Sequence, residues 1–166
     1  MLEYRIVKAG DQDLAFLEEM LYQAVYVPPG EEKPPRNITR KPELYKYVFP
    51  WSQEADSGLI ALDAEGKKLG AAWLKLLTAD NPGWGYIGDT IPELCLALLP
   101  EYRGRGIGSA LLKQLIAETR EKYPKISLSV DPRNEALRLY QHLGFVACGK
   151  AGDSVLMLRS ESADLA

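Results

Sequence analysis

The chain has 166 residues, a mass of 18.5 kDa and a formal net charge of −3, with 46% hydrophobic and 26% charged residues. These values suit one folded domain and exclude a chain that is disordered over most of its length. The longest apolar stretch, 94–99, falls far short of the ~18–20 residues that cross a bilayer. The first residues do not resemble a secretory signal, and two cysteines are too few for a disulfide framework or a cysteine metal site. We therefore expect a cytoplasmic protein with reduced thiols.

The net charge argues against a general nucleic-acid binder, but it conceals a local asymmetry. Residues 101–150 contain nine Lys/Arg and five Asp/Glu, whereas residues 1–100 contain ten and fifteen, and residues 151–166 carry a net charge of −2. A basic segment within an acidic chain predicts one anionic ligand held locally, rather than a polyanion spread over the surface.

Hydrophobic periodicity and turn residues divide the first half into short elements separated by irregular chain. In order, these are a strand over 3–8, a helix opening at 10–11 and ending before 27, proline-rich irregular chain over 28–42, a short helix over 43–48, strands over 57–62 and 68–77 joined by a hairpin turn at 63–66, and a glycine- and aromatic-rich loop over 79–90.

The second half gives sharper patterns. In order, these are a buried strand over 91–99, a helix over 106–122, a strand over 126–130, a helix over 134–143 closed by Gly144, and strands over 145–148 and 155–159. No interior boundary is evident, so we expect one domain over 1–166 with a frayed tail at 160–166. The order βαα-ββ-β-αβ-αββ predicts an α/β fold, with a mixed sheet covered by helices on both faces.

The most informative stretch is RGRGIGS at 103–109, between a predicted strand and a predicted helix. A helix start leaves about four backbone N–H groups without partners, and the helix dipole adds partial positive charge. Glycines let the backbone approach a ligand closely, and Arg103 and Arg105 add donors. The stretch therefore predicts a phosphate or pyrophosphate site. From the residues alone, a basic surface turn is the alternative.

Two common phosphate-binding motifs fit poorly. A Walker loop ends in Gly-Lys-Ser/Thr, and Gly108-Ser109 lacks the lysine. The dinucleotide fingerprint G-x-G-x-x-G needs a glycine where Ser109 stands, although Asp131 mimics its ribose-binding acid. Only 35 residues follow Asp131, too few for the further βαβ units of such a domain. A dinucleotide-dependent oxidoreductase is thus the weaker interpretation.

Two segments resemble motifs of the GCN5-related N-acetyltransferase (GNAT) superfamily. Residues 93–108 (ELCLALLPEYRGRGIG) are similar to its Arg/Gln-x-x-Gly-x-Gly/Ala motif, with Arg103, Gly106 and Gly108 at the defining positions. Residues 134–145 (NEALRLYQHLGF) are similar to its N-x-A-x-x-L-Y-x-x-x-G-F segment. The resemblance implies a GNAT-like acyl-CoA N-acyltransferase fold, in which a central twisted mixed sheet is flanked by helices. Residues 1–90 are compatible only in element order.

The resemblance also implies that acetyl-CoA is the co-substrate and that no metal takes part. Arg103 would add positive charge at the pyrophosphate. The pyrophosphate itself would be held by the backbone amides of Gly104, Arg105, Gly106, Ile107, Gly108 and Ser109. The backbone of Leu96, Ala97 and Leu98 would pair with the pantetheine arm as an added strand. One of these amides, that of Leu98, would polarise the thioester carbonyl.

The helix over 134–143 supplies two further candidates. Asn134 is either the N-cap of that helix or, as the resemblance implies, a contact to the cofactor arm. A generic tyrosine at position 140 would be packing, whereas the matching superfamily tyrosine often protonates the departing CoA thiolate. A phenol of pKa ~10 can serve a thiol of pKa ~8.5 only with good alignment. The resemblance therefore implies a cofactor-proximal Tyr140 that acts as the general acid.

Glu93 is the expected base. An attacking ammonium must lose a proton, which calls for a carboxylate, directly or through water. Glu93 is the only acid in the predicted strand that carries the acetyl site, and burial would raise its pKa toward the useful range. Many superfamily members place a glutamate one position earlier or later, and such a slip reverses the face unless a β-bulge restores it. The alternative is an acid paired within the sheet.

Other polar and aromatic side chains carry weaker predictions. His142 is expected on a solvated helix face, and Cys95 is expected to be a core thiol, because no histidine partners it in the sequence. Six aromatic residues around the irregular segments could line an acceptor pocket, although none is singled out: Tyr22, Tyr26, Tyr45, Tyr47, Trp51 and Trp84.

The sequence thus predicts an acetyl-CoA-dependent N-acetyltransferase that moves the acetyl group to a primary amine of a small molecule or peptide in a ternary complex. The acidic balance of residues 1–100 slightly favours a cationic amine, and the preference for acetyl-CoA over another acyl-CoA is left open. A CoA-binding sensor or interaction module that has lost catalysis is the alternative. No nucleic-acid or membrane partner is expected. Homodimers are frequent in the superfamily, so a homodimer is left open.

Overall fold

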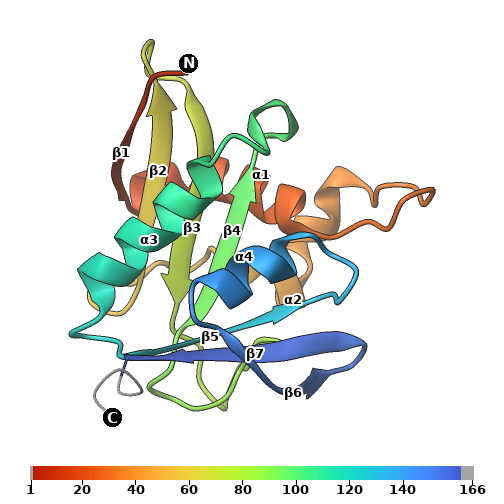
Figure 1. The fold of residues 1–166 in the computed structure, drawn as a ribbon. Coiled ribbons are helices and arrows are strands. Elements are labelled where there is room, and N and C mark those ends of the chain that lie inside the picture. The colour runs from red at the N-terminus through yellow and green to blue at the C-terminus, as the bar shows by residue number, and fades with distance from the viewer. Residues whose placement is uncertain (1, 162–166) are drawn as a thin grey trace.

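The computed structural model describes residues 2–161, which form a mixed sheet of seven strands with helices on both faces (Figure 1). The strand order is β1-β2-β3-β4-β5-β7-β6, and every neighbouring pair is antiparallel except β4 and β5. The strands are β1 (Tyr4–Ala9), β2 (Ser57–Asp63), β3 (Lys68–Lys75), β4 (Glu93–Leu98), β5 (Lys125–Val130), β6 (Val146–Ala151) and β7 (Ser154–Ser160). The α-helices are α1 (Leu14–Ala24), α2 (Pro42–Tyr45), α3 (Ile107–Thr119) and α4 (Ala136–His142). The predicted α/β class with a mixed sheet is confirmed.

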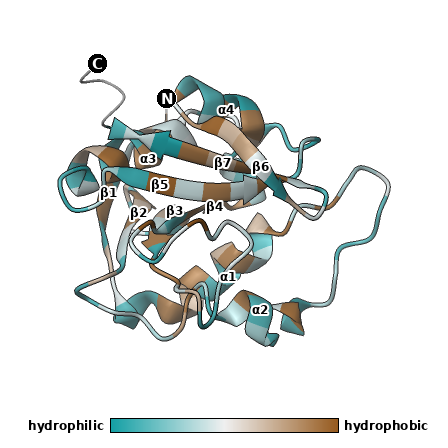
Figure 2. Ribbon diagram, turned by 90° about the horizontal axis from the view of Figure 1, so that it is seen from below, coloured by the Kyte–Doolittle hydropathy of each residue, from teal (hydrophilic) through white to brown (hydrophobic). Residues whose placement is uncertain are grey.

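The sheet separates two apolar layers, because successive side chains of a strand point to opposite faces. Ala72 and Leu74 of β3 pack in the layer under α3 and α4, whereas Ala71 and Trp73 pack in the layer under α1 and α2. Seen along the sheet, the two helix pairs lie on opposite sides of the strands (Figure 2). Burial of each large apolar side chain in these layers stabilises the fold by roughly 1.5–3 kcal/mol.

The parallel neighbours β4 and β5 pair at a single register position, Glu93↔Ser127. Beyond it they point away from each other, and α4 lies in the angle between them (Figure 1). On its other side β4 pairs with β3 in unbroken register from Gly70↔Leu98 to Lys75↔Glu93, so the β-bulge considered for this strand is not present. The sheet is therefore open along one edge of β4.

The structure shortens several predicted elements for local reasons. The helix expected over 106–122 begins at Ile107, because Gly106 adopts a left-handed φ of +84° and precedes the first turn. The helix expected over 134–143 begins at Ala136, whose amide donates to the side-chain oxygen of Asn134. Ser160, expected to start a frayed tail, instead ends β7 and pairs with Lys125. Glu161 of that expected tail donates its amide to the Pro124 carbonyl at 2.7 Å, and residues 162–166 lie outside the described residues.

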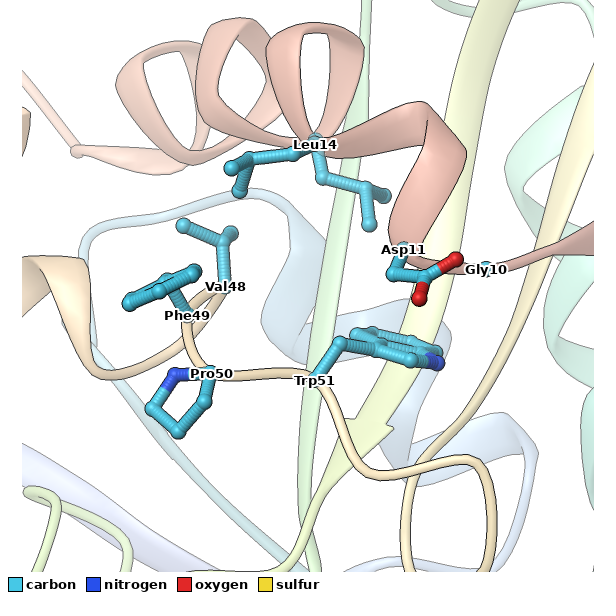
Figure 3. Close-up of a pocket in the computed structure, with 8 residues that line it drawn as sticks. Gly10, Asp11, Leu14, Val48, Phe49, Pro50 and Trp51 are labelled. Carbon is cyan, nitrogen blue, oxygen red and sulfur yellow. The ribbon is translucent and has the colours of Figure 1, made fainter.

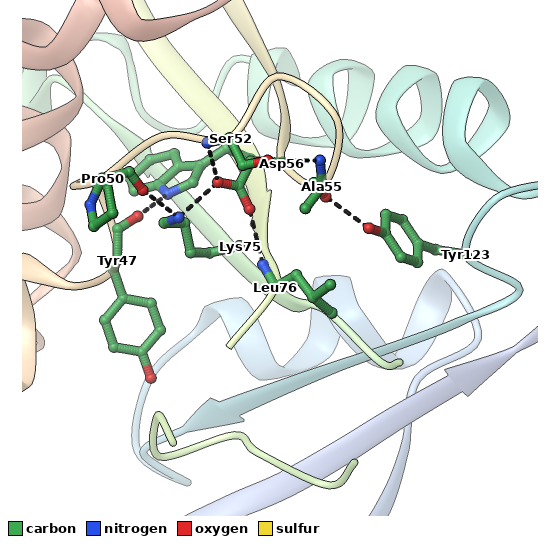
Figure 4. A network of polar contacts seen from close by, with 9 residues as sticks. Tyr47, Pro50, Ser52, Ala55, Asp56, Lys75, Leu76 and Tyr123 are labelled. Atoms are coloured by element: carbon green, nitrogen blue, oxygen red, sulfur yellow. Dashed lines mark hydrogen bonds and ion pairs between the residues drawn. The ribbon is translucent and has the colours of Figure 1, made fainter. Parts of the chain in front are cut away.

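A buried ion pair fixes the irregular chain before β2 to the end of β3 (Figure 4). The Lys75 ammonium lies 2.6 Å from Asp56 Oδ2, and the two side chains are 6% and 1% exposed. Asp56 also accepts the amides of Ser52 and Leu76, and Lys75 donates to the carbonyl of Pro50. Both charges are thus fully paired inside the protein, as buried charges must be.

We expect Asp56→Ala to lower the free energy of unfolding by about 3–5 kcal/mol, because it leaves the Lys75 ammonium buried without a counter-charge. Urea denaturation followed by circular dichroism measures this loss. The double variant Asp56→Asn/Lys75→Met, which buries no charge, should lose less. A loss within about 0.5 kcal/mol for Asp56→Ala, as at an ordinary surface site, would contradict the burial of the pair.

Candidate functional site

The open edge of β4 presents unpaired backbone groups. The Leu99 amide donates to the Leu69 carbonyl at 2.9 Å, which fixes the alternation of the antiparallel β3–β4 ladder. In that alternation the backbone of Ala97 bonds to β3, whereas the backbones of Leu96 and Leu98 point toward the opening beside β5. An extended ligand with amide groups could therefore pair with β4 as an added strand does. Of the three positions expected to make this contact, Leu96 and Leu98 face the opening and Ala97 does not.

The glycine-rich turn lies beside the same edge, between β4 and α3. Gly104 and Gly106 have φ of +75° and +84°, a left-handed conformation that glycine adopts without strain. Arg103 and Arg105 are exposed, as are the two glycines. Gly108 is buried, and a Cβ at that position would lie 3.7 Å from the side chains of Leu96 and Leu98. The N-terminus of α3, with its free amides, is thus packed against the open edge of β4, an arrangement that suits an anion.

Glu93 occupies the point where β4 and β5 part, and it is 2% exposed. Its Oε1 accepts the hydroxyl of Tyr47 at 2.8 Å and the amide of Gly85 at 2.7 Å. Burial raises the pKa of Glu93, although the hydrogen bonds from Tyr47 and Gly85 oppose the shift. Such a carboxyl can take up and release a proton closer to neutral pH than an ordinary glutamate.

Tyr140 is buried on α4, where its ring meets that of Phe145 edge-on at a centroid distance of 5.9 Å. Its hydroxyl makes no hydrogen bond within residues 2–161. Burial raises the pKa of Tyr140, so the phenol stays protonated. Tyr140 packs in the apolar layer under α3 and α4, whereas Cys95, two residues after Glu93, packs against the layer under α1 and α2.

These features match a known family. A family model described as acetyltransferase (GNAT) family matches residues 21–145, which is most of the chain. The chain belongs to the GNAT family. The resemblance carried by residues 93–108 and 134–145 is therefore confirmed, and the match also covers the last turn of α1 and the segments that precede β4.

Two curated relatives of this GNAT chain are mycothiol acetyltransferases. The chain is 34% identical to the one from Salinispora tropica over 99 residues, which is 58% of this chain and 30% of that protein. It is 37% identical to the one from Paenarthrobacter aurescens over 90 residues, which is 53% and 27%. The match thus spans less than a third of the length of either relative.

Solved structures share the GNAT fold over nearly the whole chain. The PaiA N-acetyltransferase from Thermoplasma acidophilum, solved in complex with coenzyme A, has a TM-score of 0.66 and 22% identity over 96% of this chain and 99% of that chain. The dodecameric spermidine N-acetyltransferase from Vibrio cholerae has a TM-score of 0.62 and 20% identity over 98% and 96%. At these identities the likeness shows the fold alone.

The remaining candidates have structural surroundings in this GNAT chain. The side-chain oxygen of Asn134 accepts the Ala136 amide, the first of α4, at 3.0 Å, although the N-cap position is that of Glu135. His142 is exposed on α4. Burial raises the pKa of the Cys95 thiol well above its usual range, which keeps it protonated and a poor nucleophile. Within residues 2–161, no three His, Cys, Asp or Glu side chains gather as a metal site, and no helix has the length and apolar character to cross a membrane.

Of the six aromatic candidates, only two lie at Glu93. Tyr47 donates its hydroxyl to Glu93, and its ring stacks on that of Trp84 at 6.1 Å. The other four lie elsewhere: Tyr45 stacks on Phe49, Tyr22 and Tyr26 donate to the carbonyls of Pro34 and Arg133, and Trp51 lines a separate hollow. Sequence reasoning named Tyr47 and Trp84 only among six aromatic residues. The two glycines around Trp84 were a usable signal, because a Cβ at Gly83 or Gly85 would lie within 2.8 Å of the Glu93 carboxyl.

A separate hollow of about 180 Å³ lies between the start of α1 and residues 48–51 (Figure 3). Its walls are mostly apolar, from Leu14, Leu17, Val48, Phe49 and Pro50. Asp11 is its one ionisable side chain, and neither Glu93 nor the open edge of β4 lines it. The hollow is therefore separate from Glu93 and from the glycine-rich turn beside β4.

We expect Gly106→Val to abolish acetyl-CoA binding while the protein still folds, because a side chain would force the left-handed turn to change and displace the amides that are expected to hold the pyrophosphate. Gly66→Val is the matched control, since Gly66 has a similar φ of +86° and likewise nothing within 4 Å of a Cβ, but lies in the β2–β3 turn. Calorimetric titration measures the affinity. Equal affinity of wild type and Gly106→Val for acetyl-CoA would rule out a pyrophosphate site at residues 104–109.

Proposed function

We propose that the protein is an acetyl-CoA-dependent N-acetyltransferase that moves the acetyl group to a primary amine of a small molecule or peptide by direct transfer in a ternary complex. The observation that carries the proposal is the position of Glu93: a buried carboxyl at the head of the open strand edge, with a raised pKa. Membership of an acetyltransferase family supplies the acyl chemistry.

The acetyl-CoA contacts follow from the two features beside β4. The amides from Gly104 to Ser109 hold the pyrophosphate at the start of α3, and Arg103 and Arg105 add positive charge. The pantetheine arm pairs with the backbone groups of Leu96 and Leu98. The spare hydrogen-bonding capacity of the Asn134 amide group is available to the same arm.

The transfer needs three proton movements. Glu93 takes a proton from the acceptor ammonium, and the freed lone pair attacks the acetyl carbonyl carbon. The Leu98 amide stabilises the negative charge that develops on the carbonyl oxygen. As the carbon–sulfur bond breaks, Tyr140 gives its hydroxyl proton to the thiolate, and the second proton of the attacking nitrogen restores the Tyr140 phenol directly or through water. Because burial raises the pKa of Tyr140, its proton transfer relies on alignment of the hydroxyl with the sulfur.

The acceptor class rests on charge and on the relatives. Residues 1–100 have an excess of five acidic side chains, and a cationic amine suits that balance. One similar structure is named a spermidine N-acetyltransferase and two partial relatives are named mycothiol acetyltransferases. Both free thiols, Cys95 and Cys148, agree with the cytoplasm as the compartment.

An acceptor screen tests the proposal. Purified protein is incubated with acetyl-CoA and one amine at a time, covering polyamines, aminoglycosides, amino acids and lysine peptides, and released CoA is detected through its thiol. Amine-dependent release supports the transferase. Tight acetyl-CoA binding without release for any amine would instead favour a CoA-binding module that lacks catalysis.

Tyr140→Phe should lower turnover by roughly 10²–10⁴-fold with the best acceptor, because the variant keeps the ring against Phe145 and loses only the proton donor. Acetyl-CoA affinity should change little, since the contact matters mainly as the thiolate leaves. Initial rates at saturating acetyl-CoA measure the effect, and circular dichroism checks the fold. Full turnover in the variant would make Tyr140 a packing residue.

A further inference from the structure

The two oxygens of the Glu93 carboxyl have different surroundings. Oε1 accepts two hydrogen bonds, from the Tyr47 hydroxyl and the Gly85 amide. Oε2 is buried and has no hydrogen-bond partner within the described part of the chain. The amide of Gly83 lies close enough to favour the charged carboxylate, but it does not reach hydrogen-bond geometry. A buried carboxylate oxygen without a partner is costly, which calls for a reason.

We propose that Tyr47 is a positioning residue that, together with the Gly85 amide, holds Oε1 of Glu93 so that Oε2 is the oxygen that takes the proton from the acceptor amine. This inference rests on the proposed function. In the step, an N–H bond of the acceptor ammonium breaks and an Oε2–H bond forms. The carboxylate becomes a neutral carboxyl, and the electron pair stays on the nitrogen for its attack on the acetyl group.

The side chain and the backbone of Tyr47 are both fixed by contacts, so the residue can hold the Glu93 carboxyl in one orientation. Its hydroxyl accepts the amide of Trp84 at 2.8 Å, and its carbonyl accepts the indole N–H of the fully buried Trp73 at 2.8 Å. The ring stacks on that of Trp84 at an interplanar angle of 16°. Since both ends of the residue are fixed, the direction of its hydroxyl toward Glu93 is fixed as well.

Residues 83–85 complete the arrangement by lying directly against the carboxyl. A Cβ at Gly83 would lie 2.3 Å from Oε2, and a Cβ at Gly85 would lie 2.8 Å from Oε1. The carbonyl of Gly85 accepts the hydroxyl of Ser127 at 2.6 Å, which ties this segment to β5. Gly83 thus covers Oε2 with backbone alone, so the proposed proton transfer requires this segment to move outward before the amine, or a water bound to it, reaches Oε2.

The inference predicts a change in protonation and not merely in rate. The Tyr47 hydrogen bond favours the charged form of Glu93, so its removal in Tyr47→Phe raises the pKa of Glu93 further. A base must be deprotonated to act, so the acid limb of the pH profile of kcat/KM should move to higher pH. On that limb kcat/KM should fall by about tenfold, the equivalent of one hydrogen bond to a charged group.

The experiment compares wild type, Tyr47→Phe and Tyr45→Phe. Tyr45 is two residues away and makes no hydrogen bond to Glu93, so its variant should match wild type in every measurement. The pH profile of kcat/KM is measured with the best acceptor. In parallel, the Glu93 carboxyl is titrated by carbon-13 NMR of glutamate-labelled protein, with its signal identified by its loss in Glu93→Gln. We expect both midpoints to move to higher pH in Tyr47→Phe alone.

The outcomes separate this inference from the function on which it rests. An unmoved NMR midpoint in Tyr47→Phe, with wild-type turnover intact, overturns the role of Tyr47 and leaves the transferase standing. If the NMR midpoint of Glu93 moves but the acid limb of kcat/KM does not, Glu93 is not the base. That result also overturns the proposed role of Tyr47. Absence of turnover in wild type with every amine overturns the proposed function itself. If Tyr47 acts only through Glu93, Tyr47→Phe should add no further loss of rate to Glu93→Gln.

Discussion

The single parallel pair between β4 and β5 is the constraint on which the site depends. Past Glu93↔Ser127 the two strands part, so β4 keeps a partner only on the β3 side. The backbone groups of Leu96 and Leu98 that face the opening lack a strand to satisfy them, and such groups are costly unless water or a ligand binds them. A sheet that closed fully at this point would be more regular, but it would have no place for an extended ligand.

The same pair determines the surroundings of Glu93. Ser127, opposite Glu93, binds the Gly85 carbonyl, and Gly85 in turn donates its amide to Glu93. Residues 83–85 are therefore held over the carboxyl from the β5 side, while Tyr47 approaches from the segment after α2. Two hydrogen bonds stabilise the charged form, and burial opposes it with the larger effect. The carboxyl is thereby destabilised as an anion without being left wholly unpaired.

The sequence predicted the second half of the chain better than the first, for a physical reason. In residues 91–146 the strand, turn and helix follow each other directly, so spacing alone places the glycine-rich turn at the start of α3, within one residue of its first position, and Tyr140 on α4. The α/β class also followed from element order. Tyr47 could not be chosen in this way, because 46 residues separate it from Glu93 and the chain between them forms two strands and two loops. Sequence patterns also could not show that the backbone of Ala97 faces β3 and not the opening. That direction depends on the β3–β4 register, which a periodic pattern does not specify.

Two buried charged side chains stand opposite each other in the β3–β4 register, and each is handled differently. Glu93 is paired with Lys75 in that register, and burial raises its pKa although two hydrogen bonds oppose the shift. The Lys75 ammonium is bound by Asp56 and by the carbonyl of Pro50, so its charge is paired without Glu93. Because Asp56 and Pro50 belong to the chain that follows Tyr47, the same contacts anchor that chain to the end of β3. The Asp56–Lys75 pair therefore helps to hold in place the segment from which Tyr47 reaches the Glu93 carboxyl.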